Sequence, residues 1–113
     1  MAILYTMYVA VLSKLINKKH KYEVRIFELD EGSLTPIDNI KFGASGYGDY
    51  TTGTTDYQKN NYISRHKSRE DWTESGYFTA GFWSRWILWN KKTIKESIKD
   101  INERFYNIRV FLE

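Results

Sequence analysis

Residues 78–90 read FTAGFWSRWILWN, and this stretch carries the strongest core signal in the chain. Its large aromatic residues recur at helical spacing, at Phe78, Phe82, Trp86 and Trp89. Most of the remaining positions are apolar as well, and a helix that is apolar nearly all round is a buried one. The stretch therefore predicts a central helix against which the rest of the domain packs.

An amphipathic helix is predicted immediately after this stretch. Thr93 and Glu96 form the capping-box pattern that marks the start of a helix. Apolar side chains then recur at helical spacing, at Ile94, Ile98, Ile101, Phe105 and Ile108. The last five residues, RVFLE, suit a final strand.

The chain before the Trp-rich stretch predicts a β-hairpin. Residues 21–29, KYEVRIFEL, begin with a clear alternation of apolar and polar side chains, which is typical of a half-buried strand. Residues 30–33 have turn chemistry, and a second strand is expected around Asn39–Phe42. Residues 43–55 hold four of the seven glycines and are expected to form a long loop.

The N-terminal stretch is assigned as a separate segment, with residues 1–20 as a hydrophobic extension and residues 21–113 as one domain. Alternation from Ile3 to Val11 suits a buried strand, and other spacings in the same stretch suit a helix face equally well. The lysines follow the apolar run, unlike those of a signal peptide, and Lys14 interrupts it before the roughly 20 residues of a membrane span. A packed element is expected, and a membrane partner is not.

These elements predict an α+β fold, in which a small antiparallel β-sheet is packed by two or three C-terminal helices. One of these helices is expected over residues 57–67, with Asp56 as its candidate N-cap. A chain of 113 residues is long enough for one hydrophobic core. The absence of Cys excludes a disulfide framework and a thiolate metal site.

Positive charge is concentrated in the back half of the chain. The net charge is +3, but residues 21–56 carry three bases against seven acids, whereas residues 57–113 carry eleven bases against seven acids. Lysines also gather at the start of the second helix, where they oppose the helix dipole and where a bound anion would relieve that conflict. This distribution suits a polyanionic partner.

The candidate binding residues combine this charge with aromatic rings. Lysine and arginine contact phosphates, and exposed aromatic rings stack on bases. Nucleic-acid contact is therefore assigned to Lys59, Arg65, Lys67, Arg69, Lys91, Lys92, Tyr47 and Tyr50. Two alternatives stay open: the tyrosines belong to the core and the bases are solvated, or both belong to a protein interface.

No catalytic residue, cofactor or metal site is predicted. His66 and Glu70 would share one face of a continuing helix, but one histidine and one carboxylate make an incomplete metal site. The acids between Asp49 and Glu74 show no spacing diagnostic of Mg²⁺, and no serine has a base clearly beside it. The loop GASGYGDY lacks the Gly-Lys-Ser/Thr ending of a phosphate-binding loop.

Three runs of the sequence resemble a known family, namely IKFGASGYGDYTTGT, YISRHKSREDW and TAGFWSRWILWNKKTIKESI. They are similar to a small uncharacterised family, a domain of unknown function, of nucleocytoplasmic large DNA viruses that infect algae and amoebae. Those proteins usually begin near Lys21, carry a His-Lys pair in place of Thr52–Thr54, and often have Pro in place of Lys92. The resemblance implies a viral origin and brings no catalytic residues.

The expected function is therefore that of a small, basic, non-enzymatic viral protein associated with the virion or with nucleic acid. Its expected location is the virion, or the host-cell cytoplasm and viral factory. The alternative is a minor capsid or other structural protein that docks on viral proteins such as capsid subunits. A metal-dependent nuclease that uses His66 and nearby acids is a distant alternative.

Overall fold

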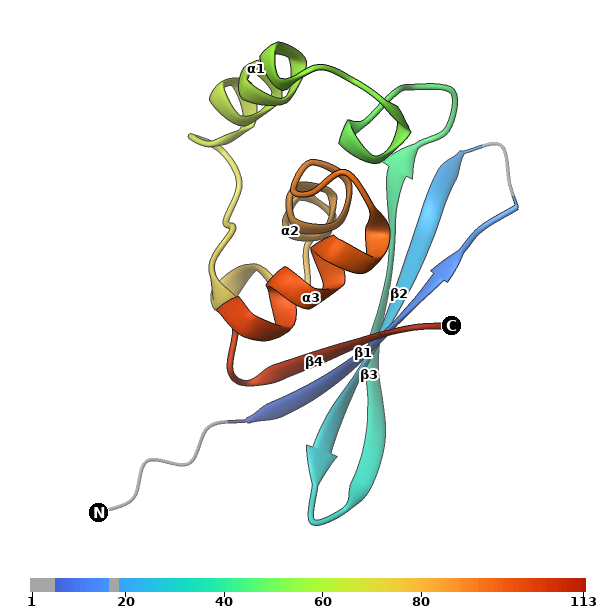
Figure 1. Cartoon of the computed structure of the whole chain (residues 1–113). Coiled ribbons are helices and arrows are strands. Elements are labelled where there is room, and N and C mark those ends of the chain that lie inside the picture. The colour runs from blue at the N-terminus through green and yellow to red at the C-terminus, as the bar shows by residue number, and fades with distance from the viewer. Residues whose placement is uncertain (1–5, 17–18) are drawn as a thin grey trace.

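The computed structural model describes residues 6–16 and 19–113, which form one sheet with helices on one of its sides (Figure 1). The elements follow in the order β1 (Met7–Lys14), β2 (His20–Asp30), β3 (Ser33–Ala44), α1 (Asp56–His66), α2 (Ala80–Trp83), α3 (Ile94–Arg104) and β4 (Ile108–Leu112). Short 3₁₀ turns lie at Tyr50–Thr52 and Glu74–Gly76, and a π-helical segment, Ser84–Leu88, continues α2. The predicted α+β fold is confirmed.

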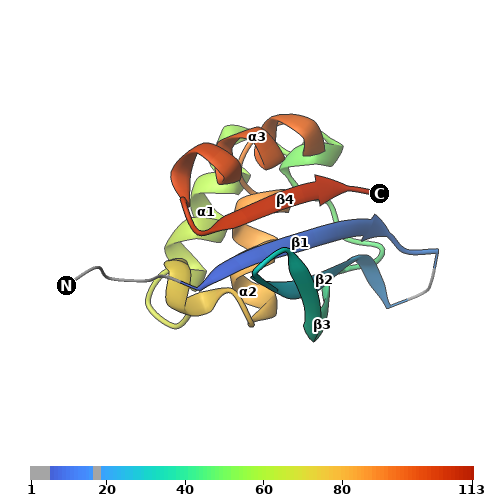
Figure 2. The same ribbon diagram turned by 90° about the horizontal axis from the view of Figure 1, so that it is seen from below.

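The sheet is mixed rather than antiparallel. Its strand order is β3-β2-β1-β4, which Figure 2 shows from below. The β1–β2 and β2–β3 pairs are antiparallel, whereas β4 runs parallel to β1. The expectation of a purely antiparallel sheet was therefore wrong for β4. The helices lie between β3 and β4 in the chain, and such a long crossover joins strands that run in the same direction.

The predicted hairpin is confirmed and is longer than expected. β2 pairs with β3 from His20 opposite Ala44 to Asp30 opposite Ser33. The two residues between the strands, Glu31 and Gly32, have φ angles of 48° and 81°. Positive φ at both central positions is the type I′ geometry, whose twist matches that of the flanking strands.

Part of the N-terminal stretch belongs to the sheet. Met7–Lys14 form β1, which lies between β2 and β4, and Ala10 and Leu12 on this strand are fully buried. A strand is therefore confirmed for the described part of this stretch, so the domain includes β1. The face that it buries is the opposite of the expected one, because Ala10 and Leu12 enter the core whereas Met7, Val9 and Val11 lie on the other face. Ile3 and the rest of residues 1–5, like residues 17–18, lie outside the described residues.

The core lies between the helices and one face of the sheet. Alternate side chains of every strand point into it, which is the period of two expected of a half-buried sheet. They meet a buried cluster from the Trp-rich stretch, consisting of Phe82, Trp83, Trp86, Ile87 and Leu88. The expected central position of this stretch is confirmed.

The Trp-rich stretch is not one continuous α-helix from residue 78 to residue 90. α2 begins at Ala80, after its N-cap Thr79, and Phe78 lies outside the helix with 43% of its surface exposed. The Trp89 amide donates to the Ser84 carbonyl five residues earlier, at 3.1 Å. This wider turn is a π-bulge, a feature that occurs often at functional sites.

Both remaining helices begin at a threonine. Thr93 is confirmed as the N-cap of α3, since its hydroxyl accepts a hydrogen bond from the Glu96 amide. The Glu96 carboxylate accepts from the Thr93 hydroxyl instead of from the Thr93 amide that a capping box would use. α1 covers the predicted helix, but Thr55 rather than Asp56 is its N-cap. Among the described residues, no helix combines the length and the apolar character needed to cross a membrane.

Candidate functional site

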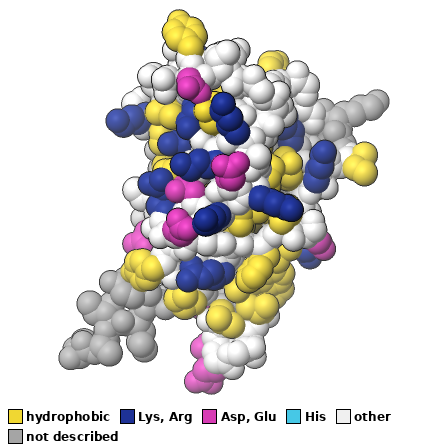
Figure 3. All heavy atoms as spheres, in the orientation of Figure 1, with side chains coloured by type: hydrophobic (Ala, Val, Ile, Leu, Met, Phe, Trp, Pro, Cys, Tyr) yellow, Lys and Arg dark blue, Asp and Glu magenta, His cyan; other side chains and the backbone are white. Residues whose placement is uncertain are grey.

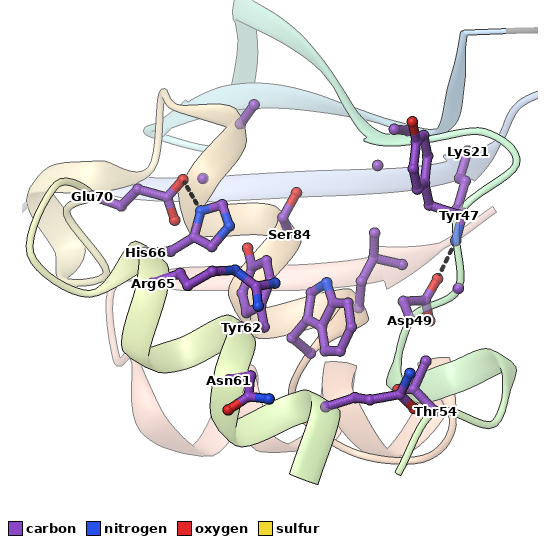
Figure 4. A pocket seen from close by; sticks show the side chains of 18 residues that line it. Lys21, Tyr47, Asp49, Thr54, Asn61, Tyr62, Arg65, His66, Glu70 and Ser84 are labelled. Atoms are coloured by element: carbon purple, nitrogen blue, oxygen red, sulfur yellow. Dashed lines mark hydrogen bonds and ion pairs between the residues drawn. The ribbon is translucent and has the colours of Figure 1, made fainter. Parts of the chain in front are cut away.

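A pocket of about 660 Å³ opens between α1, the start of α2 with its π-helical continuation, and the loop that follows β3 (Figure 4). α1 forms one wall, and the loop residues Tyr47 and Asp49 lie across from it. The floor includes Ser84 of the π-helical segment. The volume is in the range of small-molecule sites.

One face of α1 supplies much of the lining. The side chains that reach the pocket are Gln58, Asn61, Tyr62, Arg65 and His66. Their spacing of three and four residues places them on one face of a helix. This face is mostly polar, and Tyr62 is the buried residue that α1 contributes. The inner face of α1 therefore lines a site more than it fills a core.

His66 is held in a fixed orientation. Its Nδ1 lies 3.2 Å from Oε2 of Glu70, and the other carboxylate oxygen of Glu70 accepts a hydrogen bond from the Trp72 indole at 3.1 Å. A histidine whose Nδ1 is engaged by a carboxylate presents Nε2 for other contacts. The two side chains therefore meet, although α1 ends at His66 and does not continue to Glu70 as a shared helix face would require.

Gly81 makes room for this pair. A Cβ atom at Gly81 would lie 2.7 Å from Cδ of Glu70 and 2.8 Å from its Oε2. The carboxylate of Glu70 can therefore lie against α2 only because position 81 has no side chain. Gly81 also lines the pocket, so the glycine shapes both the wall and the support of His66.

Aromatic rings form a stack along the α1 side. The Tyr62 ring lies between His66, at 4.3 Å between centroids, and Trp89, at 4.5 Å and 7° from parallel. Burial is the main cause that raises the pKa of the Tyr62 phenol, and the nearby Glu70 carboxylate raises it further. The phenol is therefore neutral at physiological pH, and Trp89 is half-buried beside it.

The opposite wall is fixed by a buried carboxylate. Asp49 is 2% exposed, and it pairs with Nζ of Lys21 at 2.5 Å. It also accepts hydrogen bonds from the amide of Thr51 at 2.8 Å and from its hydroxyl at 2.5 Å. A buried charge is costly unless it is paired in this way. Asp49 therefore orders the glycine-rich loop and neutralises Lys21.

Among the described residues, Arg65 is the charged residue of the lining that has no counter-ion. Lys21 is paired with Asp49 and His66 with Glu70, whereas no hydrogen bond or ion pair within the described residues holds the Arg65 guanidinium. Figure 4 shows its side chain passing Tyr62 toward the middle of the pocket. An unpaired guanidinium here offers five donors to an anionic ligand.

A second group of the predicted residues meets around Tyr50. Nζ of Lys59 lies 4.5 Å and Nζ of Lys92 lies 5.9 Å from the centre of the Tyr50 ring. Nζ of Lys59 also donates to the Asn90 carbonyl at 2.6 Å. Burial lowers the pKa of Lys59, and the charges of Arg85 and Lys91 lower it further. Positive charges are therefore held close together here despite their mutual repulsion.

The structure thus divides the eight predicted binding residues into groups. Tyr47 and Arg65 line the pocket, while Tyr50, Lys59 and Lys92 meet near the start of α1. Lys67, Arg69 and Lys91 are exposed, the first two just after α1. Figure 3 shows Lys and Arg side chains gathered over the helical side of the molecule, with acidic ones among them.

Tyr50 is less available for contact with nucleic acid than its assignment to the binding residues required. Its hydroxyl donates to Asp56 at 2.6 Å, and this hydrogen bond raises the pKa of the Tyr50 phenol. One side of its ring faces lysines. Tyr50 therefore acts as a platform for cations, whereas Tyr47, which is 75% exposed, is free to contact a ligand.

The carboxylates considered for metal binding have other roles. Asp49 and Glu70 form the contacts described above, and Asp71 accepts hydrogen bonds from the amide and hydroxyl of Thr73. Within the described part of the chain, no group of three or more His, Cys, Asp or Glu could hold a metal ion.

Sequence reasoning missed the pocket itself. It did not assign Asn61, Tyr62 or Ser84 to the site, and it did not connect Lys21 with the glycine-rich loop. One signal was present, because positions 58, 61, 62, 65 and 66 share a face of the predicted helix while most of them are polar. A polar inner face on a helix that packs against a core indicates a site.

Comparison with known proteins gives one match. Residues 10–66 match the model of a family that is described as a family of unknown function (DUF5754). No curated protein and no solved structure matches the chain. The match begins within β1 and ends with the last residue of α1, so it covers the sheet hairpin, the glycine-rich loop and one wall of the pocket.

Proposed function

We propose that this chain, which belongs to the family of unknown function DUF5754, is a non-enzymatic protein that binds nucleic acid through the basic and aromatic residues of its helical side. The observation that carries the proposal is that Lys59 and Lys92 meet at the Tyr50 ring. The charges of Lys91 and Arg85 act on Lys59 as well and lower its pKa, although Asp56 and Asp100 partly offset them. A polyanion would relieve this repulsion.

The basic residues are spread along α1 at a spacing that suits a strand. Lys59 lies in the first half of the helix, and Arg65, Lys67 and Arg69 lie at and beyond its end. Within α1, the six residues from Lys59 to Arg65 rise about 9 Å at ~1.5 Å per residue. Consecutive nucleotides of one strand rise about 3.4 Å each, so this part of the series covers roughly three of them.

The setting follows from the resemblance of three sequence runs to proteins of giant viruses. We propose that the protein is virus-encoded and acts in the virion or in the host-cell cytoplasm and viral factory. Nucleic acid is the first partner under this proposal. The three runs contribute all of the pocket lining except Lys21, Gln58 and Asn61, which supports a common role for these runs in binding.

The test is fluorescence-anisotropy binding to labelled single- and double-stranded DNA across a series of salt concentrations. If all six basic residues contact phosphates, log K should fall against log salt with a slope of about −4 for a single strand, from ~0.7 per contact. Each change of Arg65, Lys67 or Arg69 to Ala should reduce this slope by about one.

The matched control is Lys41→Ala, since Lys41 is exposed on β3 and lies on the far face of the sheet from the helices. This variant also removes one positive charge, but from a face that DNA should not contact. The slope of log K against log salt should therefore stay nearly unchanged. Absence of binding at low salt would reject the proposal. Equal effects of Lys41→Ala and Lys67→Ala would show that net charge, rather than this surface, binds DNA.

A second candidate is a structural role through protein contact, and the outer face of the sheet favours it. Apolar side chains of neighbouring strands meet there across the registers Met7–Leu29, Val9–Phe27 and Val11–Phe111. Phe111 is 55% exposed. Stable co-purification with a capsid protein, insensitive to salt and to nuclease, would support this role, and Phe111→Ser should weaken that association.

A further inference from the structure

We propose that the pocket holds one unpaired nucleotide of a single strand, with its base among the aromatic side chains and its phosphate on Arg65. This inference rests on the proposed nucleic-acid binding, and it adds a preference for unpaired strands that a basic surface alone does not have. It concerns the pocket lined by Tyr47, Asn61, Arg65, Ser84 and Trp89.

The size of the pocket suits a nucleotide. Its volume of about 660 Å³ falls within the ~300–1,000 Å³ of sites that bury ligands of this class. A duplex cannot offer a base to such a pocket, because its bases are stacked and paired, whereas a single strand can turn one base out at little cost. The shape of the site therefore selects for unpaired nucleotides.

The lining offers flat surfaces for a base. Trp89 lies at the end of the ring stack that continues through Tyr62 to His66, and it is half-buried in the pocket wall. Tyr47 lies on the opposite wall and is 75% exposed, so its ring has few contacts of its own. Every nucleobase has a π-face that can stack on such rings, which makes this part of the recognition tolerant of sequence.

The polar groups of the lining suit the edge of the base and the phosphate of a nucleotide. The Asn61 amide makes no hydrogen bond within the described residues, and an amide can both donate to and accept from a base edge. The guanidinium of Arg65 has no counter-ion among the described residues, and Figure 4 shows it extending from α1 across Tyr62. Since Asp49 neutralises Lys21, Arg65 is the charge that remains for a phosphate.

The pocket is also continuous with the proposed phosphate path. Arg65 belongs both to the lining and to the basic series of α1, two residues before Lys67. A strand that follows this series therefore passes the mouth of the pocket. A nucleotide bound at Arg65 would place its neighbours toward Lys67 and Arg69.

The test compares three labelled probes of equal length, namely a single strand, the same strand with one abasic position, and the matching duplex; the two single strands carry the same number of phosphates. The single strand should bind most tightly. An abasic position at the pocket should weaken binding roughly 5- to 150-fold, which is the value of one base–aromatic stack. A set of probes with the abasic position moved along the strand locates the position that matters.

The variant Ala80→Phe fills the pocket without removing a charge, because Ala80 lines it and is exposed at the start of α2. It should bind the intact strand as weakly as the wild type binds the abasic strand, with an unchanged salt slope. Lys67→Ala is the matched control, which should lower the slope and keep the sensitivity to the abasic position. The abasic comparison uses the unaltered protein and so does not depend on how the variant folds.

Three outcomes overturn the inference. Salt-dependent binding that is equal for all three probes would leave the proposed function in place and remove the pocket from it. Tight displacement of the strand by free nucleoside monophosphate would assign the pocket to a free nucleotide instead. Absence of binding to any probe at low salt would reject the proposed function together with this inference.

Discussion

Helices α1 and α3 are alike in length and in their threonine caps, yet they are held in opposite ways. Both have eleven residues. The inner face of α3 is mostly apolar and includes the fully buried Ile101, and its buried Ser97 accepts a hydrogen bond from the Lys91 amide. The inner face of α1 is mostly polar, and its attachments include the stack of Tyr62 on Trp89 and the hydrogen bond from Lys59 to the Asn90 carbonyl. α3 therefore holds the fold together, whereas α1 forms the wall of a site.

The difference has a thermodynamic consequence. Free energies of local opening within one protein range from near zero to the full free energy of unfolding, and elements with few buried apolar contacts lie at the low end. Elements that bind ligands are commonly drawn from that end. The contrast therefore predicts that changes in α3 mainly lower stability, whereas changes in α1 mainly affect the site. Three measurements test this prediction.

The largest expected effect is that of Ile101→Ala in α3. This change leaves a cavity in the core and should lower the free energy of unfolding by about 2–5 kcal/mol. The comparison is Ile63→Ala in α1, where the side chain is only half-buried and the cost should be under about 1.5 kcal/mol. Urea denaturation followed by circular dichroism measures both. Similar costs for the two changes would contradict the division of roles.

An intermediate effect is expected of Trp89→Leu, which removes the ring that anchors Tyr62. An aromatic pair is worth about 0.5–1.5 kcal/mol beyond its buried area. The amides of α1 should therefore exchange with solvent several-fold faster, while those of α3 keep their wild-type rates. Hydrogen exchange measured by mass spectrometry resolves the two helices.

The control for that experiment is Trp86→Leu. Trp86 contacts Phe105 and lies between the guanidinium groups of Arg85 and Arg104, each 4.4 Å from its ring centre. Its loss should speed exchange in α3 as much as in α1. If Trp89→Leu gave this global pattern as well, α1 would be as firmly integrated as α3.

The same contrast explains what the sequence could and could not predict. The N-cap and the buried face of α3 were predicted from the sequence. Both depend on local patterns, because the capping residues and the apolar spacing lie within the helix itself. The hairpin was predicted for the same reason. The parallel pairing of β4 with β1 was missed, since the direction of a returning strand depends on how the helices cross over and not on its own residues.

The site was only partly predictable. The assigned basic and aromatic residues include Tyr47 and Arg65, which line the pocket, but the sequence did not indicate the other residues that meet them there. Lys21 and Asp49 are 28 residues apart in sequence, and their pairing is fixed by the loop that follows β3. The π-bulge that places Ser84 on the floor has no recognised sequence signal. Such contacts come from packing and cannot be obtained from local patterns.

The smallest expected effect on stability, and the most specific test of the site wall, is that of Gly81→Ala. Alanine favours a helix by up to about 1 kcal/mol over glycine, but the new Cβ would overlap the Glu70 carboxylate. Because that carboxylate is the end of a flexible side chain, it can move aside, and the free energy of unfolding should change by less than about 1 kcal/mol.

The consequence of Gly81→Ala should appear at His66 instead. With Glu70 displaced, Nδ1 of His66 loses its partner and the ring is no longer held in one orientation, so ¹⁵N chemical shifts of the imidazole should change. Glu70→Gln removes the same charge without a steric change and should give a similar shift of the imidazole signals. If Gly81→Ala instead unfolded the protein, the wall of the pocket would be as rigid as the core. The division of roles between α1 as the wall of a site and α3 as a stabilising helix would then be wrong.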